Sequence, residues 1–245
     1  MIVLQEYAEL YENEAFLQGD PSWFMHQVTG VENQETMAFL ASSLSYGSRK
    51  QFIPKIQQLL DWSGGEPYQW VLQGRFTEHF CADDTDCFYR LYNNSVMYGF
   101  LKVFQELLRE YGSLGAYVRQ NATDGFTAVE AICTYFADKG VSVVVPKNTQ
   151  SACKRVCMFL RWMVRNNSPV DLGLWADFID RKTLIIPLDT HVLSQSVRLG
   201  LLNSKTASMA TARRLTAALS TVFPDDPLRG DFALFGYGVN NAAAK

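Results

Sequence analysis

Apolar side chains recur every three or four residues along most of this chain, which is the spacing of amphipathic helices. The pattern predicts helices over residues 3–16, 36–62, 86–112, 125–140, 149–167, 190–202, 206–223 and 228–239. Pro54 is expected to break or kink the second of these, and Gly47 is an earlier candidate for the break. Gly112 and Gly140 mark the ends of two others.

One short segment departs from this helical pattern. Residues 141–148, VSVVVPKN, are rich in β-branched side chains and would form a strand by composition, but no partner strand is evident. We therefore expect an extended segment that leads into a hairpin between two helices. Because strands do not alternate with helices, a parallel α/β sheet is disfavoured. The expected fold is all-α, with about ten helices.

Composition adds a charge asymmetry to this picture. The 245 residues are 48% hydrophobic and 13% aromatic, ample for a packed core, and the net charge of -3 argues against a general polyanion binder. Residues 145–229 carry 12 Lys or Arg and 6 Asp or Glu, a net of +6, whereas the rest of the chain is -9. This asymmetry predicts a basic face on the second half, although ordinary solvated helices also gather charge.

The cysteines and histidines suggest no redox or metal chemistry. Five cysteines, an odd number, include Cys153 and Cys157 on one predicted helix face, a pattern typical of reduced thiols. The three histidines are isolated, so no metal or other cofactor is expected. No signal peptide or membrane-spanning run is visible, and we expect a cytoplasmic protein.

The strongest chemical signal is PLDTHVLSQSVRLGL, residues 187–201, together with Lys154, 35 positions before Asp189. Asp189 follows an apolar run and stands where a helix begins, so it is a good N-cap. A lysine nucleophile and an aspartate in one cleft can break a glycosidic bond through a Schiff base. The plainer alternatives are an aspartate that only caps its helix and a lysine that is a solvated charge.

The predicted helix 149–167 has an apolar stripe, with Lys154, Arg161 and Arg165 on another stripe. Lys154 lies near the helix N-terminus, where the dipole disfavours a cation and so favours the neutral, nucleophilic amine. Lys147, in the preceding hairpin, is the rival nucleophile. We prefer Lys154 because the apolar stripe resumes two residues after it.

The order of these motifs resembles the helix-hairpin-helix DNA glycosylases, in which apolar-x-Asp-Thr-His-Val follows a lysine-bearing hairpin. Pro146 matches the common pattern Leu-Pro-Gly-Val-Gly-x-Lys, but both glycines are missing, and Asn148 could supply left-handed backbone angles instead. The Lys-to-Asp spacing is closest to that of archaeal-type 8-oxoguanine DNA glycosylases. Residues 166–183 would then be an insertion.

The resemblance implies one glycosylase-like unit over residues 1–245. The middle of the chain would form one lobe, the N-terminal segment and C-terminal helices the other, with the active-site cleft between them. Lys154 would attack C1′ of a damaged nucleoside, and Asp189 would deprotonate the amine or stabilise the sugar cation. The implied activity is excision of an oxidised base, 8-oxoguanine favoured, with AP lyase activity.

The resemblance also implies a pocket for the flipped base. Asp231 and Phe235 lie four apart on the last predicted helix, where a carboxylate could read a guanine edge and a ring could stack. The alternative is that Phe235 is a core residue and Asp231 a first-turn helix charge. Further base-binding candidates are Tyr46, Gly47 and Pro187. The expected DNA contacts are Lys147, Asn148, Arg155, Arg161 and His191, although His191 could instead bond only within its own helix.

The expected partner is damaged double-stranded DNA, bound by a monomer with no membrane association. Three other functions fit the sequence less well. They are a glycosylase for oxidised pyrimidines or alkylated purines, a non-catalytic DNA-binding protein on this fold, and an all-α interaction module.

Overall fold

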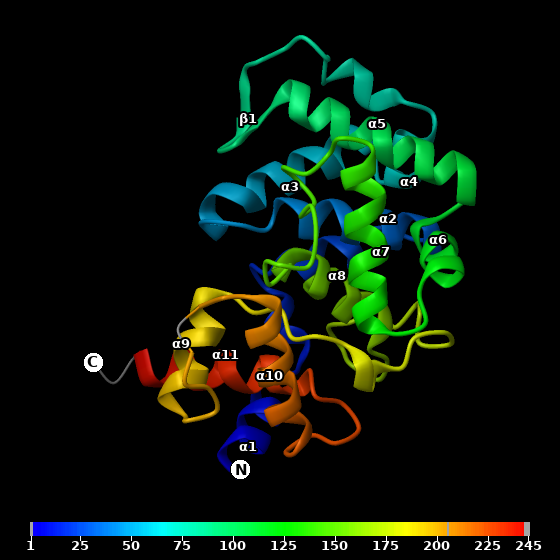
Figure 1. The fold of residues 1–245 in the computed structure, drawn as a ribbon. Coiled ribbons are helices and arrows are strands. Elements are labelled where there is room, and N and C mark those ends of the chain that lie inside the picture. Colours follow the sequence, from blue (N-terminus) through cyan, green and yellow to red (C-terminus); the bar gives the residue numbers. More distant parts are fainter. Residues whose placement is uncertain (1, 205, 243–245) are drawn as a thin grey trace. The chain divides into compact units, whose positions relative to one another are not determined.

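The computed structural model describes residues 2–204 and 206–242, and helices make up most of them (Figure 1). Within these residues the only sheet is a two-stranded antiparallel hairpin of β1 (Cys87–Tyr89) and β2 (Tyr92–Asn93). The all-α prediction is confirmed at this level. No helix of the described ranges has the length and apolar character needed to cross a membrane.

The chain divides into two compact units that each combine distant segments. One unit, here called the terminal unit, consists of residues 1–18, 123–129 and 149–245. The other, the middle unit, consists of residues 19–122 and 130–148.

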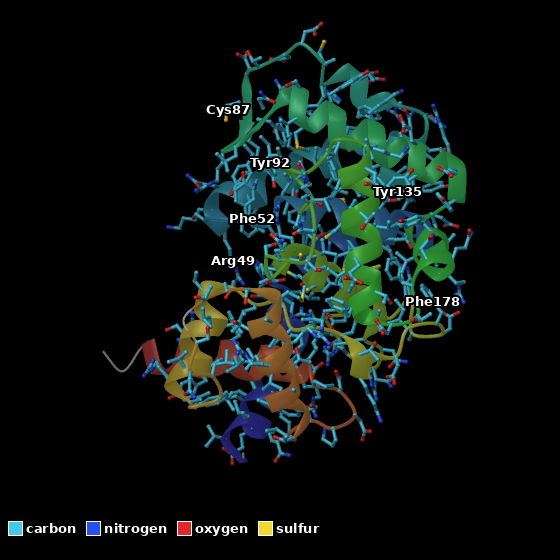
Figure 2. All side chains as sticks on the ribbon, viewed as in Figure 1. Arg49, Phe52, Cys87, Tyr92, Tyr135 and Phe178 are labelled. Atoms are coloured by element: carbon cyan, nitrogen blue, oxygen red, sulfur yellow. The ribbon has the colours of Figure 1, made fainter. Side chains whose placement is uncertain are left out.

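The middle unit is built around a core of phenylalanine rings. Its helices are η2 (Pro21–His26), α2 (Val31–Leu44), α3 (Arg49–Ser63), α4 (Pro67–Leu72), η3 (Arg75–Glu78), α5 (Asn94–Tyr111), α6 (Leu114–Asn121) and most of α7 (Gly125–Asp138), where η denotes a 3-10 helix. Phe39 contacts Phe104 with ring centroids 4.9 Å apart and Phe136 at 5.5 Å. Figure 2 labels Phe52 and Tyr92, which are also buried in this unit.

The terminal unit contains α1 (Ile2–Tyr11), η1 (Glu14–Leu17), α8 (Lys154–Val164), η4 (Arg181–Thr183), α9 (Thr190–Arg198), α10 (Met209–Ser220) and α11 (Arg229–Ala242). The first and last helices pack side by side (Figure 1). Tyr7 meets Tyr237 at a centroid distance of 5.9 Å and Tyr11 meets Phe235 at 5.7 Å, so the two helices run antiparallel. Aromatic edge-to-face contacts thus tie the N-terminal segment to the C-terminal helix.

Two predicted helices of the middle unit differ from the structure: residues 36–62 are divided between α2 and α3, and residues 86–112 begin with a hairpin. The break in residues 36–62 falls at Gly47, which has φ +81°, while Pro54 lies inside α3. The predicted helix 86–112 begins only at Asn94, because residues 87–93 form the β-hairpin. Arg90 takes φ +52° there, and the Asn93 side chain caps α5 by accepting from Val96 N at 2.8 Å. Its predicted end at Gly112 is confirmed.

The lysine helix also starts later than predicted, at Lys154 rather than Thr149. Cys153 precedes it with φ +46°, a left-handed conformation that ends any helix running from residue 149. Asn148, proposed for such a conformation, does not adopt one. Residues 141–148 form neither helix nor strand. This agrees with the prediction that they connect two helices and have no partner strand.

Candidate active site

The structure brings Lys154 and Asp189 together in the terminal unit. Lys154 Nζ lies 3.8 Å from Asp189 Oδ2, and the two side chains are 31% and 39% exposed. Each residue stands at the start of a helix, Lys154 as the first residue of α8 and Asp189 as the N-cap of α9. The result is a solvent-accessible amine beside a carboxylate, at two helix N-termini.

The local sequence explains the position of Asp189. Leu184 to Leu188 form an extended, buried segment, and Ile186 N donates to Thr216 Oγ1 at 3.0 Å. Directly after this anchored segment, Asp189 Oδ1 accepts from Val192 N at 2.8 Å and starts α9. One carboxylate oxygen is therefore committed to the cap, and the other faces Lys154.

Asp231, in the first turn of α11, adds a second carboxyl group to this electrostatic environment. Burial raises the pKa of Asp231, and the Asp189 carboxylate raises it further. Arg161 and Lys154 oppose this shift by stabilising the charged form. Asp231 thus responds to both members of the Lys154–Asp189 pair.

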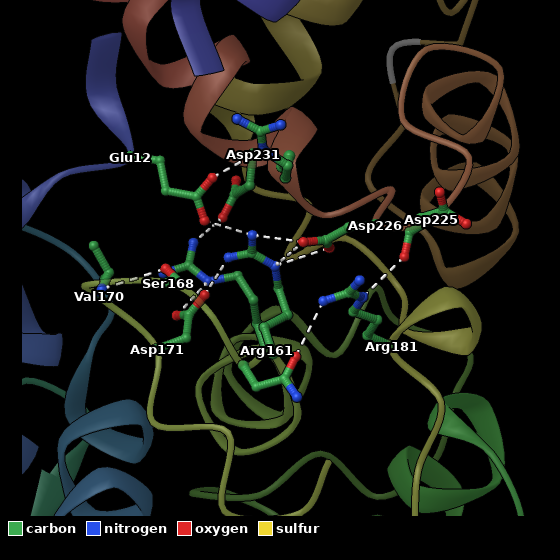
Figure 3. A network of polar contacts seen from close by, with 12 residues as sticks. Glu12, Arg161, Ser168, Val170, Asp171, Arg181, Asp225, Asp226 and Asp231 are labelled. Atoms are coloured by element: carbon green, nitrogen blue, oxygen red, sulfur yellow. Dashed lines mark hydrogen bonds and ion pairs between the residues drawn. The ribbon is translucent and has the colours of Figure 1, made fainter. Parts of the chain in front are cut away.

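A buried ion network continues from Asp231 along α8 (Figure 3). Arg161 Nη1 donates to Asp231, and Arg161 Nε donates to Asp171 Oδ1 at 3.2 Å. The other Asp171 oxygen accepts from Arg165 Nη1, so Asp171 joins the two arginines. Burial raises the pKa of Asp171, against the opposing effect of both arginines.

Arg165 connects this network to α1 and to the segment before α11. Its Nε and Nη2 donate to Asp226 at 2.9 and 2.8 Å, a two-pronged contact, and Nη2 also reaches Glu12 Oε1 at 2.5 Å. Arg229 Nε donates to the other Glu12 oxygen at 3.0 Å. The Arg161 and Arg165 guanidinium groups lie 4.6 and 5.3 Å from the centre of the buried Phe232 ring.

The burial of these arginines corrects the predicted cationic stripe. Arg161 is 4% exposed and Arg165 1%, so Arg161 is not placed to meet a phosphate. Every residue from Val156 to Val164 is buried, which means that α8 has no solvated face over this stretch. The sequence could have indicated this burial, because Arg161 alone interrupts a run of apolar residues from Val156 to Val164. A buried arginine in turn requires carboxylate partners.

One predicted base contact is also corrected, and two others can be placed in the structure. Pro187 is buried in the extended segment before Asp189 and offers no surface to a base. Phe235 packs edge-on against Tyr11 and Phe16, with centroids 5.7 and 5.1 Å away, but it remains partly exposed, so its role as a base contact stays a prediction. Asp231 is bonded to Arg161 rather than standing as a solvated first-turn charge.

The remaining predicted residues fall into two groups. In the terminal unit, Arg155 is half-buried and His191 is exposed. The His191 ring lies against Gly238: a Cβ added to Gly238 would be only 2.2 Å from His191 Nε2. Lys147 and Asn148 are exposed in the middle unit, and Tyr46 and Gly47 contact the β-hairpin of that unit.

A pocket of about 770 Å³ opens beside the ion network in the terminal unit. It is lined in part by Glu12, Arg165, Asp226 and Arg229, whereas neither Lys154 nor Asp189 lines it. The pocket is therefore separate from the candidate catalytic pair. Among the described residues no group of three or more His, Cys, Asp or Glu could hold a metal ion.

The helices and the lysine–aspartate pair define an all-α protein with a candidate catalytic pair. Comparison with known families gives one match. The chain belongs to the family described as "Protein of unknown function (DUF2400)", which matches residues 20–240. None of the curated proteins and none of the solved structures matches it. The expected membership in the helix-hairpin-helix glycosylases is therefore wrong: the matching family is a different one, with no stated function.

Proposed function

We propose that this protein is a DNA base-excision glycosylase with AP lyase activity, in which Lys154 is the nucleophile. The observation that carries the proposal is the pairing of Lys154 Nζ with Asp189 Oδ2 at 3.8 Å, both partly exposed. A salt bridge of this length and exposure adds little to stability, so the pair is better suited to chemistry than to holding the fold together. The two-lobed, glycosylase-like fold expected from the sequence is part of the same proposal.

The chemistry begins with transfer of a proton from the Lys154 ammonium to Asp189. The free amine attacks C1′ of the nucleotide, the glycosidic bond breaks, and the base leaves with the bonding electrons and takes up a proton. The C1′–O4′ bond then opens, O4′ takes up a proton, and the nitrogen forms an imine with C1′. Loss of a proton from C2′ expels the 3′ phosphate, and water hydrolyses the imine to release Lys154.

Asp189 contributes by its position and charge. Its carboxylate next to C1′ stabilises the positive charge that develops on the sugar as the base departs. The cap to Val192 N keeps Oδ2 directed toward Lys154. Asp231 and Arg161 form the adjoining buried pair and add to the local field.

The base is a separate part of the proposal. 8-Oxoguanine is the first substrate to test, and oxidised pyrimidines and alkylated purines are the next. Phe235 is partly exposed and packs against Phe16, so its stacking role stays a prediction, and the choice among these bases is left to the lesion assay. The protein is expected to act as a cytoplasmic monomer on damaged duplex DNA.

The test is covalent trapping. Purified protein is incubated with duplexes that each carry one defined lesion or an abasic site, with and without borohydride, and base release, strand scission and adduct are measured. Wild-type protein should form a borohydride-dependent adduct, and Lys154→Ala should form none. Lys147→Ala tests the rival nucleophile, and Lys182→Ala, an exposed lysine paired with Asp225, is the matched control. An adduct that persists in Lys154→Ala would overturn the assignment.

Asp189→Asn separates catalysis from capping. Asparagine caps helices about as well as aspartate, so the variant should melt close to wild type. It should nevertheless lose most base release, because the amide neither accepts the lysine proton nor carries a negative charge. Normal turnover by Asp189→Asn would leave Asp189 with the cap as its only role.

A further inference from the structure

The pocket of about 770 Å³ in the terminal unit is partly built by residues 166–183, the segment that the sequence resemblance leaves as an insertion without a role. Other parts of its lining come from one face of α1 and from the chain between α10 and α11. A pocket of this size is in the range that holds small-molecule ligands. The insertion contributes Asn166, Asn167, Pro169 and Arg181.

The insertion folds back onto the end of α8, and this sets the pocket wall. Leu172 N and Gly173 N both donate to the Trp162 carbonyl, at 2.8 and 3.2 Å. Gly173 has φ +66°, and a Cβ there would lie 2.8 Å from Asn166 Cβ, so the close approach requires glycine. The chain turns at Asn167 with φ +60°, a conformation that asparagine tolerates. These contacts fix Asn166 and Asn167 at the pocket.

Arg181 is held in the pocket wall by two uncharged acceptors. Its Nε donates to the Asp225 carbonyl oxygen at 2.9 Å, and its Nη1 donates to Asn166 Oδ1 at 3.0 Å (Figure 3). Neither bond neutralises the guanidinium charge, and Nη2 has no hydrogen-bond partner among the described residues. Because two of its nitrogen atoms are already fixed, Arg181 loses little freedom when Nη2 binds a ligand.

The other charges of the lining are paired, with one exception. Within ion-pair distance the structure shows Glu12 with Arg165 and Arg229, Asp226 with Arg165, and Asp225 with Lys182. Of the lining charges, only Arg181 and Glu9 have no oppositely charged partner at that distance within residues 2–204 and 206–242. Glu9 is exposed on α1. The pocket therefore presents one uncompensated positive group and one uncompensated negative group.

These two open charges indicate the class of ligand. A carboxylate suits the planar guanidinium of Arg181, and an ammonium suits the carboxylate of Glu9. A phosphate monoester carries up to two negative charges and no cation, so it would leave Glu9 facing an anion. Gln5 and Asn167 also line the pocket, and their side-chain amides have no hydrogen-bond partner in the described part of the chain. They can pair with the amide groups of a ligand.

We propose that this pocket binds a small zwitterion, an amino acid or a short peptide, with its carboxylate on Arg181 and its ammonium on Glu9. The exposed ring of Pro224 supplies apolar surface for a side chain of the ligand. The proposal does not rest on the glycosylase function, because neither member of the candidate catalytic pair lines the pocket. It gives the insertion a role, which is to build a binding site.

The first measurement is a thermal-melting screen of the full chain against the common amino acids and a set of alanyl dipeptides at millimolar concentration. A ligand that binds only the folded state raises Tm. Calorimetric titration of the best probe then gives its Kd. The same probe with its amino group acetylated, or with its carboxylate converted to an amide, should bind roughly tenfold more weakly, since each change removes one charge-assisted contact. Whether amino acids or only dipeptides bind identifies the length of the ligand.

Two variants assign the two ends of the probe. Arg181→Gln should weaken binding of the zwitterion roughly tenfold but leave binding of the amide analogue unchanged. Glu9→Gln should weaken binding of the zwitterion similarly but leave binding of the acetylated analogue unchanged. The matched controls are Arg214→Gln, an exposed arginine of α10 bonded to Thr211 Oγ1 at 3.3 Å, and Glu6→Gln, an exposed carboxylate of α1. Neither control residue lines the pocket, so both controls should bind like wild type.

The absence of any rise in Tm across the panel would overturn the proposal. Equal affinities of wild type, Arg181→Gln and Glu9→Gln for the bound probe would also overturn it. Covalent trapping by Lys154, measured on the same preparations, should be unchanged in both variants. Loss of probe binding with trapping intact, or absence of trapping with probe binding intact, therefore separates this proposal from the glycosylase proposal.

Discussion

The two ends of α8 carry the same kinds of charged residue in opposite settings. At its start, Lys154 and Asp189 are about one-third exposed and 3.8 Å apart. At its end, Arg165 is 1% exposed and bonded to Asp171, Asp226 and Glu12. Burial, rather than residue type, separates the two pairs: the buried end can hold the fold together, whereas the exposed end is open to solvent.

The two ends of α8 also differ in how many carboxylate oxygens already accept hydrogen bonds. At the buried end, both oxygens of Asp171 and of Glu12 accept from arginines. At the exposed end, Asp189 uses one oxygen for its cap and leaves the other at a distance from Lys154 longer than a normal hydrogen bond. A substrate could displace the Lys154–Asp189 contact at little cost. Displacing the buried contacts of Asp171 and Glu12 with the arginines would cost much more.

The largest effect is expected at Asp171. Asp171→Ala should lower the free energy of unfolding by about 3–5 kcal/mol, because Arg161 and Arg165 would both lose a fully buried partner. Asp189→Ala should cost only about 1 kcal/mol, the loss of a helix cap. Urea unfolding of both variants checks the contrast, and equal losses would contradict it.

A smaller loss is expected from Arg165→Lys. Lysine keeps the charge but has no planar fork, so the two-pronged contact with Asp226 and the bond to Glu12 cannot both be kept. We expect a loss of about 1.5–3 kcal/mol. Lys154→Arg, measured in the same way, should be close to neutral for stability, and a comparable loss there would remove the distinction between the two ends.

The ion pairs at the buried end should also make stability depend on pH, through Glu12. Burial tends to raise the pKa of Glu12, but Arg165 and Arg229 outweigh it and leave the pKa below its usual value of 4.5. Glu12 therefore contributes stability above pH 4.5 that is lost as the pH falls through its folded pKa. Wild type should lose more stability than Glu12→Gln on acidification below that value. Parallel melting curves for the two proteins from neutral to acid pH would argue against this role.

The smallest effect is expected for the coupling between Lys154 and Asp189. A double-mutant cycle with Lys154→Ala and Asp189→Asn should give an interaction energy of about 0.2–1 kcal/mol in unfolding, as for other exposed pairs. The same two substitutions should each remove most base release. A coupling of several kcal/mol would instead make the pair a structural contact.

The sequence identified one end of α8 much better than the other. Asp189 could be singled out because it follows an apolar run and precedes a helix, and Lys154 because an apolar stripe resumes two residues after it. The partners of Arg161 and Arg165 have no such pattern, since Glu12 and Asp226 come from distant segments and Asp171 from the irregular segment after α8. Local spacing can predict that a buried arginine needs a carboxylate, but not which carboxylate folding brings to it.

The fold follows the same rule. Helices α7, α9, α10 and α11 lie close to where apolar spacing predicts them, since their periodicity is strong and their ends carry glycine or a capping residue. The wrong starts fall at Arg90 and Cys153, which adopt left-handed conformations without being glycine or asparagine. Tertiary contacts, such as those of Tyr46 with the hairpin, set these positions, and no local pattern announces them.

The pairing of α1 with α11 has a practical consequence for fragment design. The family match spans residues 20–240, whereas Glu12 and the aromatic residues that cover α11, Tyr7, Tyr11 and Phe16, precede it. An expression fragment trimmed to the matched residues would strip one side of the C-terminal helix and leave Arg229 and Arg165 without Glu12. Domain boundaries drawn from sequence similarity and from the folded unit therefore differ here, and the first eighteen residues should be kept in any shortened version of this protein.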